Sequence, residues 1–313
     1  MLYLGGKFDI LFLIKLAYSV PSLLFMITIL LLLITKIYKN DYTFKNEFYP
    51  FVVYSLMNNF MFWFTQFIFF GLAGIPDIRI IYITNSNYAK IEYSFSTFQM
   101  CNIVLTLFAI SFNRFVCVKY PTKYKRYFLY ENVVISVLTI FIISFFVGAV
   151  SFFYPSTFMY DIPSRTLYSL YKASGLTFYF RMIFIVTSTI IILLSFLFNA
   201  FGSFVLVKRK VSNNNVSSKD YWFPLYSIFV FVTSTLLESC YILRFISNTF
   251  NSPLFCVIAM KLIYYLGDLC IFGDFYFLVF FSADIKREVR SFSKKMMIKK
   301  KQTVIIQPSR IMN

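Results

Sequence analysis

The sequence predicts an all-α membrane protein in which seven transmembrane helices form a bundle. Three observations support this fold class. Hydrophobic residues occupy 59% of the 313 positions and charged residues only 14%, whereas a water-soluble domain carries about a quarter charged residues. Seven apolar stretches each reach the length of about 20 residues that a helix needs to cross the hydrocarbon core. Basic residues gather in alternate connections between these stretches, as expected for a multi-pass protein.

The expected spans follow one another with short connections. The prolines agree with this division, because only Pro21 of the nine lies inside a span. The others fall in connections, tails or first helical turns, where a missing N–H costs little. We find no internal repeat of the kind typical of inverted-repeat transporters. The spans are expected at residues 11–35, 49–72, 93–118, 130–152, 176–207, 222–246 and 254–281.

The distribution of Lys and Arg predicts the orientation. If the N-terminus is outside, 20 Lys and Arg residues lie in the inner connections and tail, and five lie outside. Basic residues favour the cytoplasmic side of a membrane. We therefore expect the N-terminus outside and the C-terminus inside, with residues 1–281 forming the bundle and residues 282–313 forming a basic cytoplasmic tail.

The tail predicts a short amphipathic helix on the membrane surface. Ile285, Val289, Phe292 and Met296 recur at helical spacing and form one apolar stripe, surrounded by Lys and Arg. Such a helix lies on an anionic inner leaflet. Nucleic-acid binding is not expected, because the tail offers neither a folded basic domain nor base-stacking aromatic residues.

The residue types exclude several chemistries. The chain contains no histidine, which removes Ser-His-Asp and Cys-His catalysis and His-ligated metal sites. Its five cysteines form no C-x-x-C pair and no disulfide framework. We therefore expect no enzyme activity, no metal and no cofactor.

Asn113-Arg114-Phe115 closes the third span. It resembles the acidic-Arg-aromatic triplet that ends the third helix of rhodopsin-like G-protein-coupled receptors. In those receptors the arginine switches between a resting contact and the G protein. Here Asn113 replaces the acid. The alternative interpretation of Arg114 is that it is one more basic residue on the inner side.

A wider set of short motifs points to a narrower family. Taken in order over about residues 15–290, they resemble the nematode chemoreceptor-type serpentine receptors, most closely serpentine receptor class gamma. The motifs are Pro21-Ser22-Leu23, Phe48-Tyr49, Ser111-Phe112-Asn113-Arg114-Phe115, Tyr120-Pro121, Lys123-Tyr124 and Gly267-Asp268.

The resemblance implies a multi-pass receptor in the plasma membrane of sensory neurons. Such a receptor detects a small molecule or pheromone and signals through a heterotrimeric G protein. The sequence also departs from the expected pattern. The late proline of the seventh span is absent near Phe275, and the usual disulfide to the second outer loop cannot form because residues 153–176 contain no Cys.

Ionisable residues inside spans are costly and therefore candidates for function. Glu238 and Lys261 are expected at the same depth, roughly 11–12 Å below the outer surface. Adjacent spans joined by a short loop are usually neighbours, so the two are expected to pair. The pair could contact a ligand or could serve only as a structural salt bridge. Arg181 could join them or extend to the interface.

Four further polar residues could form a relay between the second and seventh spans, by resemblance to rhodopsin-like receptors. They are Asn58, Asn59, Asp268 and Asp274. Lys261 could alternatively bind retinal as a Schiff base, but Glu92, the candidate counterion, is expected at the membrane surface. A transporter or channel that uses the intramembrane charges as a path is the alternative to a receptor.

Overall fold

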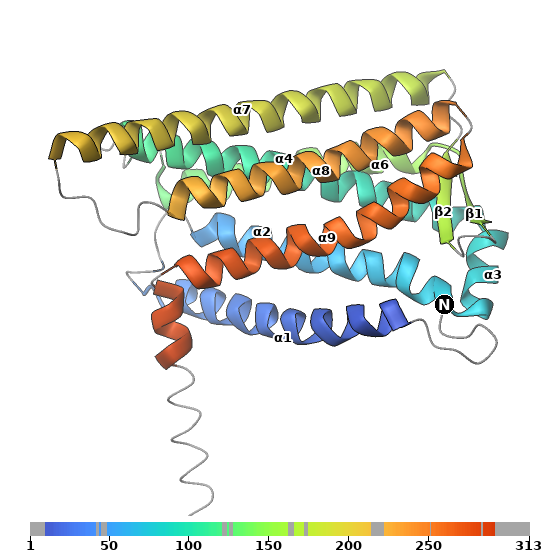
Figure 1. The fold of residues 1–313 in the computed structure, drawn as a ribbon, viewed down its shortest axis with the longest axis horizontal. Coiled ribbons are helices and arrows are strands. Elements are labelled where there is room, and N and C mark those ends of the chain that lie inside the picture. The colour runs from blue at the N-terminus through green and yellow to red at the C-terminus, as the bar shows by residue number, and fades with distance from the viewer. Residues whose placement is uncertain are drawn as a thin grey trace, which may run out of the picture.

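The computed structural model describes residues 10–41, 44, 49–120, 124, 128–161, 166–171, 175–213, 222–250, 252–282 and 284–291. Long helices run side by side and form the bundle (Figure 1). They are α1 (Ile10–Tyr38), α2 (Tyr49–Gln66), α4 (Ser86–Lys119), α6 (Tyr130–Phe152), α7 (Leu176–Asn213), α8 (Trp222–Thr249) and α9 (Pro253–Phe281).

The helices confirm an all-α membrane bundle. Six of those that the structure describes are long and apolar enough to cross a membrane. The second predicted span is α2 continued by the π-helix η1 (Phe67–Gly71). After the 3-10 turn η2 (Leu72–Gly74), the chain bends by 97° into α3 (Pro76–Thr84). Counted as one span, this bent pair gives seven in the described part of the chain, the number that the sequence predicts.

Two elements were not expected from the sequence. The first is α3, which begins with Pro76 at its first turn, where the missing N–H costs nothing. The second is an antiparallel hairpin of β1 (Ser156–Asp161) and β2 (Thr166–Tyr171), whose register runs from Ser156 opposite Tyr171 to Asp161 opposite Thr166. We call the end of the bundle that carries these elements the hairpin end, and the opposite end the tail end (Figure 1).

Helix α4 organises the packing. It contacts α2, α6 and α7 along its length and both strands at the hairpin end. The ring of helices closes where α1 contacts both α2 and α9, and where α8 contacts α7 and α9. One buried cluster joins α1, α2 and α9, and a second joins α4, α7, α8 and α9. Polar groups held by α4 therefore face several helices at once.

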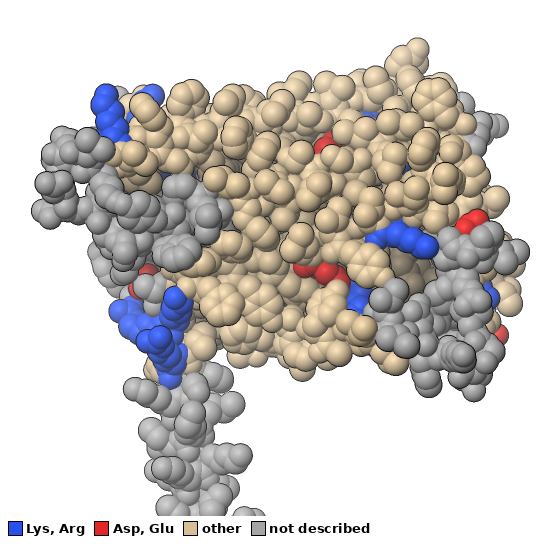
Figure 2. Space-filling model, viewed as in Figure 1, with Lys and Arg blue, Asp and Glu red and all other residues tan. Residues whose placement is uncertain are grey.

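The lipid-facing surface explains the apolar composition. Helix α6 turns a continuous apolar face outward, and the band between the two ends of the bundle is mostly free of charge on the face drawn in Figure 2. In lipid these side chains need no protein cover. The exposed apolar residues of α6 include Ile135, Leu138, Ile142, Phe145 and Phe146.

A short tail helix spans residues 284–291 and turns across the tail end of the bundle (Figure 1). Ile285 is fully buried and Val289 packs on the cluster of α1, α2 and α9. Glu288 forms an ion pair of 3.0 Å with Lys36 at the end of α1. The first half of the predicted apolar stripe is thus used to dock the helix on the bundle, whereas Phe292 and Met296 lie outside the described residues.

Gly148 allows α6 to approach α4 closely. A Cβ at this position would lie 2.8 Å from the Phe98 Cβ and 3.0 Å from the Ser94 carbonyl oxygen, and the Ser94 hydroxyl donates to the Gly148 carbonyl at 2.7 Å. Gly148→Ala should therefore destabilise the bundle, because overpacking costs about 1–3 kcal/mol. Thermal unfolding in detergent, followed by circular dichroism, measures the effect.

Helix propensity makes the opposite prediction, since Ala is favoured over Gly by about 1 kcal/mol in a helix. A Gly148→Ala variant with an unchanged or higher Tm would contradict the close α4–α6 contact.

Candidate functional site

A buried polar cluster lies at the hairpin end, where α4, α8 and β2 meet. At its centre the Glu92 carboxylate is fully buried. Its Oε2 atom lies 3.2 Å from Nη2 of Arg244 and accepts a hydrogen bond of 2.5 Å from the Ser169 hydroxyl. Its Oε1 atom accepts from Ser96 at 2.8 Å, and Arg244 also contacts Ser169. Glu92, which was expected at the membrane surface, is thus buried inside the bundle.

Arg181 projects into the same region from the first turns of α7. Its guanidinium carbon lies 3.8 Å from the centre of the Tyr93 ring, and its Nη2 donates to the Ser151 hydroxyl at 3.3 Å. The side chain is only 6% exposed. Arg181 thus points into the bundle and does not extend to the interface, one of the two possibilities that the sequence left open.

A small cavity of about 20 Å³ separates the two arginines. Both arginines lie near Tyr93, because the Arg244 guanidinium carbon also lies 5.2 Å from its ring centre. Helices α7 and α8 each contribute one arginine to the cavity together with apolar side chains, and α4 contributes Tyr93 and two hydroxyl residues. Its lining consists of Tyr93, Ser96, Thr97, Tyr171, Arg181, Phe184, Ile185, Tyr241, Arg244 and Phe245.

The predicted Glu238–Lys261 pair is wrong. The Glu238 side chain is 3% exposed, and neither of its carboxylate oxygens has a hydrogen-bond partner among the residues that the structure describes. Lys261 instead lies on the exposed face of α9, next to Ile258 and Leu262. Equal depth in two neighbouring helices does not place two side chains on facing surfaces.

Glu238 nevertheless lies close to the hairpin-end cluster. Tyr241, one helical turn further along α8, lines the small cavity together with Arg181 and Arg244. Of the predicted ligand-binding residues, Arg181 lines this cavity, Glu238 lies one helical turn from its lining on α8, and Lys261 lies on the exposed face of α9.

Asp268 belongs to a different contact, between α1 and α9. Its Oδ2 atom lies 3.1 Å from Nζ of Lys15 and accepts a hydrogen bond of 2.5 Å from Tyr18. Lys15 also donates to the Tyr264 carbonyl at 2.9 Å. The prediction that Asp268 lies with Asn58 and Asn59 in one relay is therefore wrong. Lys15, its partner, was not among the predicted site residues.

Two motif residues have structural roles nearby. Gly267 faces α2, where a Cβ would lie 2.7 Å from Cε1 of Phe62. In α1, the Ser22 hydroxyl donates to the Tyr18 carbonyl and lies 2.7 Å from the Tyr276 hydroxyl of α9. These motifs thus mark the places where α9 meets α1 and α2.

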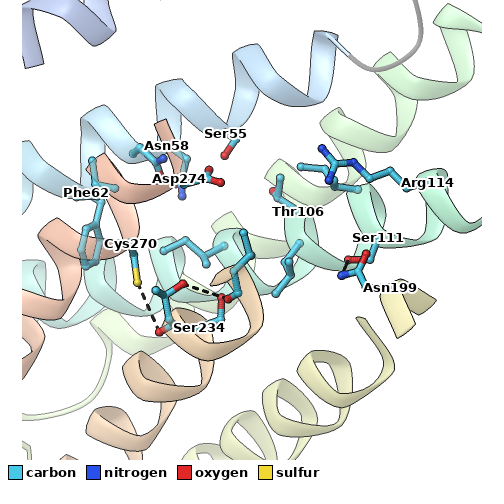
Figure 3. Close-up of a pocket in the computed structure, with 17 residues that line it drawn as sticks. Ser55, Asn58, Phe62, Thr106, Ser111, Arg114, Asn199, Ser234, Cys270 and Asp274 are labelled. Atoms are coloured by element: carbon cyan, nitrogen blue, oxygen red, sulfur yellow. Dashed lines mark hydrogen bonds between the residues drawn. The ribbon is translucent and has the colours of Figure 1, made fainter. Parts of the chain in front are cut away.

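A second cavity of about 70 Å³ lies in the half of the bundle toward the tail end, and Figure 3 shows its lining. Three of the four predicted relay residues, Asn58, Asn59 and Asp274, line it together with Arg114. Ser111 and Asn199 line its far side and are joined by a hydrogen bond of 3.0 Å from the Asn199 amide to the Ser111 hydroxyl.

The predicted coupling residues have distinct environments. Asn113 is buried, and its Oδ1 atom accepts a hydrogen bond of 3.1 Å from Tyr124 in the connection after α4. The Phe115 ring packs on Phe198 of α7 with the ring centres 5.3 Å apart. Arg114 faces the tail-half cavity. The triplet thus links α4 to its following connection, to α7 and to the cavity.

A helical membrane bundle with a small cavity toward each end of its described part is the class of protein that this geometry defines. The family model described as Srg family chemoreceptor matches residues 12–289. The chain therefore belongs to the Srg chemoreceptor family, which is a receptor family and not an enzyme family, and this confirms the resemblance to serpentine receptor class gamma. No curated protein matches the chain.

Neutralising Glu92 should destabilise the receptor. Glu92→Gln leaves the Arg244 guanidinium buried without its 3.2 Å counterion, and breaking a buried ion pair on one side costs about 3–5 kcal/mol. We expect a lower Tm in detergent and less receptor at the cell surface, measured with an N-terminal epitope.

A double variant provides the control. Combining Glu92→Gln with Arg244→Met removes both charges and should recover part of the lost stability, because no uncompensated charge remains. Wild-type stability of Glu92→Gln alone would show that this ion pair does not hold the hairpin end together.

Proposed function

We propose that the protein is a chemosensory receptor of the plasma membrane of sensory neurons. It binds a small molecule at the hairpin end and signals through a heterotrimeric G protein at the tail end. The observation that carries this proposal is that α4, α7 and α8 each contribute side chains to both cavities. A ligand that shifts these helices as rigid bodies at one end would alter the cavity at the other end.

The orientation follows from the charges. The tail end carries Lys36, Lys119 and the exposed Lys286, Arg287 and Arg290 of the tail helix, and basic residues favour the cytoplasmic face. The hairpin end is then extracellular, with the N-terminus outside. The basic side of the tail helix faces an anionic inner leaflet.

The ligand region comprises Arg181, Glu238 and the cavity beside Tyr93. These groups are buried and lie within a few helical turns of the proposed extracellular surface. Lys261 lies on an exposed face of α9 and is not included. For the same reason we do not propose a retinal Schiff base at this lysine.

Arg114 is the proposed G-protein switch, with Asn113 and Phe115 as its supports. Asn58, Asn59 and Asp274 share its cavity and are proposed to relay the change toward it. A transporter or channel would need its charges along a continuous path. Two of the intramembrane acids, Glu92 and Asp268, are instead engaged in ion pairs between helices.

Arg114→Ala should abolish the ligand-dependent G-protein response while leaving surface expression intact, because Arg114 lines the tail-half cavity and carries the proposed contact to the G protein. The measurement is calcium or cyclic-nucleotide signalling in cells, after a screen of volatile and pheromone-like compounds has found an agonist.

Lys208→Ala is the matched control, since Lys208 is an exposed basic residue of α7 toward the same end of the bundle. A fully active Arg114→Ala receptor would refute the assigned role. Ion flux or current in proteoliposomes without any G protein would favour the transporter or channel.

Epitope tags should separate the two ends of the chain. In cells that are not permeabilised, an antibody should reach a tag at the N-terminus and should fail to reach one at the C-terminus, because the basic tail end faces the cytoplasm. An accessible C-terminal tag would show that the proposed orientation is wrong and that the proposed ligand region faces the cytoplasm.

A further inference from the structure

Two arginines line the small cavity at the hairpin end, and one of them is paired with a carboxylate. Arg181 and Arg244 both face the small cavity, and Glu92 is the one carboxylate within ion-pair distance of either guanidinium among the described residues. A buried charge without a counterion is costly, most of all at membrane depth. Such an arrangement is expected where a ligand supplies the missing charge.

Arg181 is the arginine that lacks a counterion. Its polar contact is the neutral Ser151 hydroxyl at 3.3 Å, and its Nε atom has no hydrogen-bond partner within the described structure. Arg244, in contrast, is neutralised by Glu92. The Tyr93 ring holds the Arg181 guanidinium in place by stacking at 3.8 Å, which leaves the edge of the guanidinium for an acceptor.

The surroundings select the type of anion. A guanidinium edge binds a carboxylate through two parallel N–H···O bonds. The hydroxyls of Ser96 and Thr97 already donate to Glu92 and to the Tyr93 carbonyl, so the Arg181 guanidinium is the donor for the polar side of the ligand. Phe184, Ile185 and Phe245 supply apolar lining. A carboxylate attached to an apolar body matches both sides.

Resting on the proposed receptor function, we propose that Arg181 binds the carboxylate of an organic-acid ligand, with Tyr93 and Tyr171 as the aromatic walls of the site. The cavity of about 20 Å³ holds about one water-sized group. It therefore accommodates the carboxylate, and the apolar body of the ligand requires β2 to move away from α7. Tyr171 lies at the end of β2, and its ring centre is 5.6 Å from the Arg181 guanidinium carbon. In this proposal the Tyr171 ring closes the site on the side of β2.

The first test needs no signalling and uses the purified full-length receptor in detergent. Sodium hexanoate and sodium benzoate should raise the Tm of the wild-type receptor, because a ligand that binds only the folded state stabilises it. Methyl hexanoate, and sodium chloride at the same ionic strength, should raise it less. An equal shift with chloride would identify a simple anion site and overturn the organic-acid proposal, as would the absence of any shift.

The second test compares two substitutions of matched shape. Arg181→Met removes a charge that has no counterion, so the empty receptor should have an unchanged or higher Tm and should no longer respond to hexanoate. Arg244→Met strands the Glu92 carboxylate and should lower the Tm. An Arg181→Met receptor that is still stabilised by hexanoate would refute the site, and Arg181→Lys, which keeps the charge without the planar edge, should retain part of the response.

Signalling is measured separately, so that the two proposals can fail independently. For an acidic agonist, Arg181→Gln should raise the half-maximal concentration at least tenfold and leave the response to the matched methyl ester unchanged. Carboxylate binding without any G-protein response would retain the site and refute the receptor mechanism. Equal loss of response to acid and ester would refute the site.

Discussion

The arrangement of the hairpin end depends on one buried carboxylate, that of Glu92. It is bonded at once to α8 through Arg244, to β2 through Ser169 and to its own helix through Ser96. Residues 153–176 contain no cysteine, so hydrogen bonds, an ion pair and side-chain packing hold the hairpin on α4. A non-covalent attachment of this kind can open and close reversibly, which suits a surface through which a ligand must pass.

The second buried ion pair serves the closure of the helix ring. Lys15 and Asp268 join α1 to α9, the first long helix to the last, and Tyr18 reinforces the contact. Burial of apolar side chains contributes little to helix association in lipid, because lipid tails are equally apolar. Polar bonds and close backbone approaches therefore determine which helices meet. Gly148 and Gly267 provide such approaches, to α4 and α2 respectively.

The sequence predicted the bundle well because length and hydropathy alone identify spans. It failed where the direction of a side chain around its helix matters. Glu238 and Lys261 were matched by depth, yet Lys261 lies on the exposed face of α9. Asn58, Asn59 and Asp274, three of the four residues of the predicted relay, line one cavity, and their role as a relay stays a prediction. The start of α4 could have been found from Asn85, whose side chain caps the helix by accepting from the Asn87 amide at 3.0 Å.

The unpaired guanidinium at the hairpin end bears on how a signal could cross the membrane. Arg181 on α7 and Arg244 on α8 both lie near the Tyr93 ring, and Arg244 is paired with Glu92. The anion proposed to bind Arg181 would supply the missing counterion on α7 and could therefore change the position of α7 against α4 and α8. Further along, α7 holds α4 through the Asn199–Ser111 bond beside Arg114. A shift of α7 therefore acts directly on the helix that carries the proposed switch.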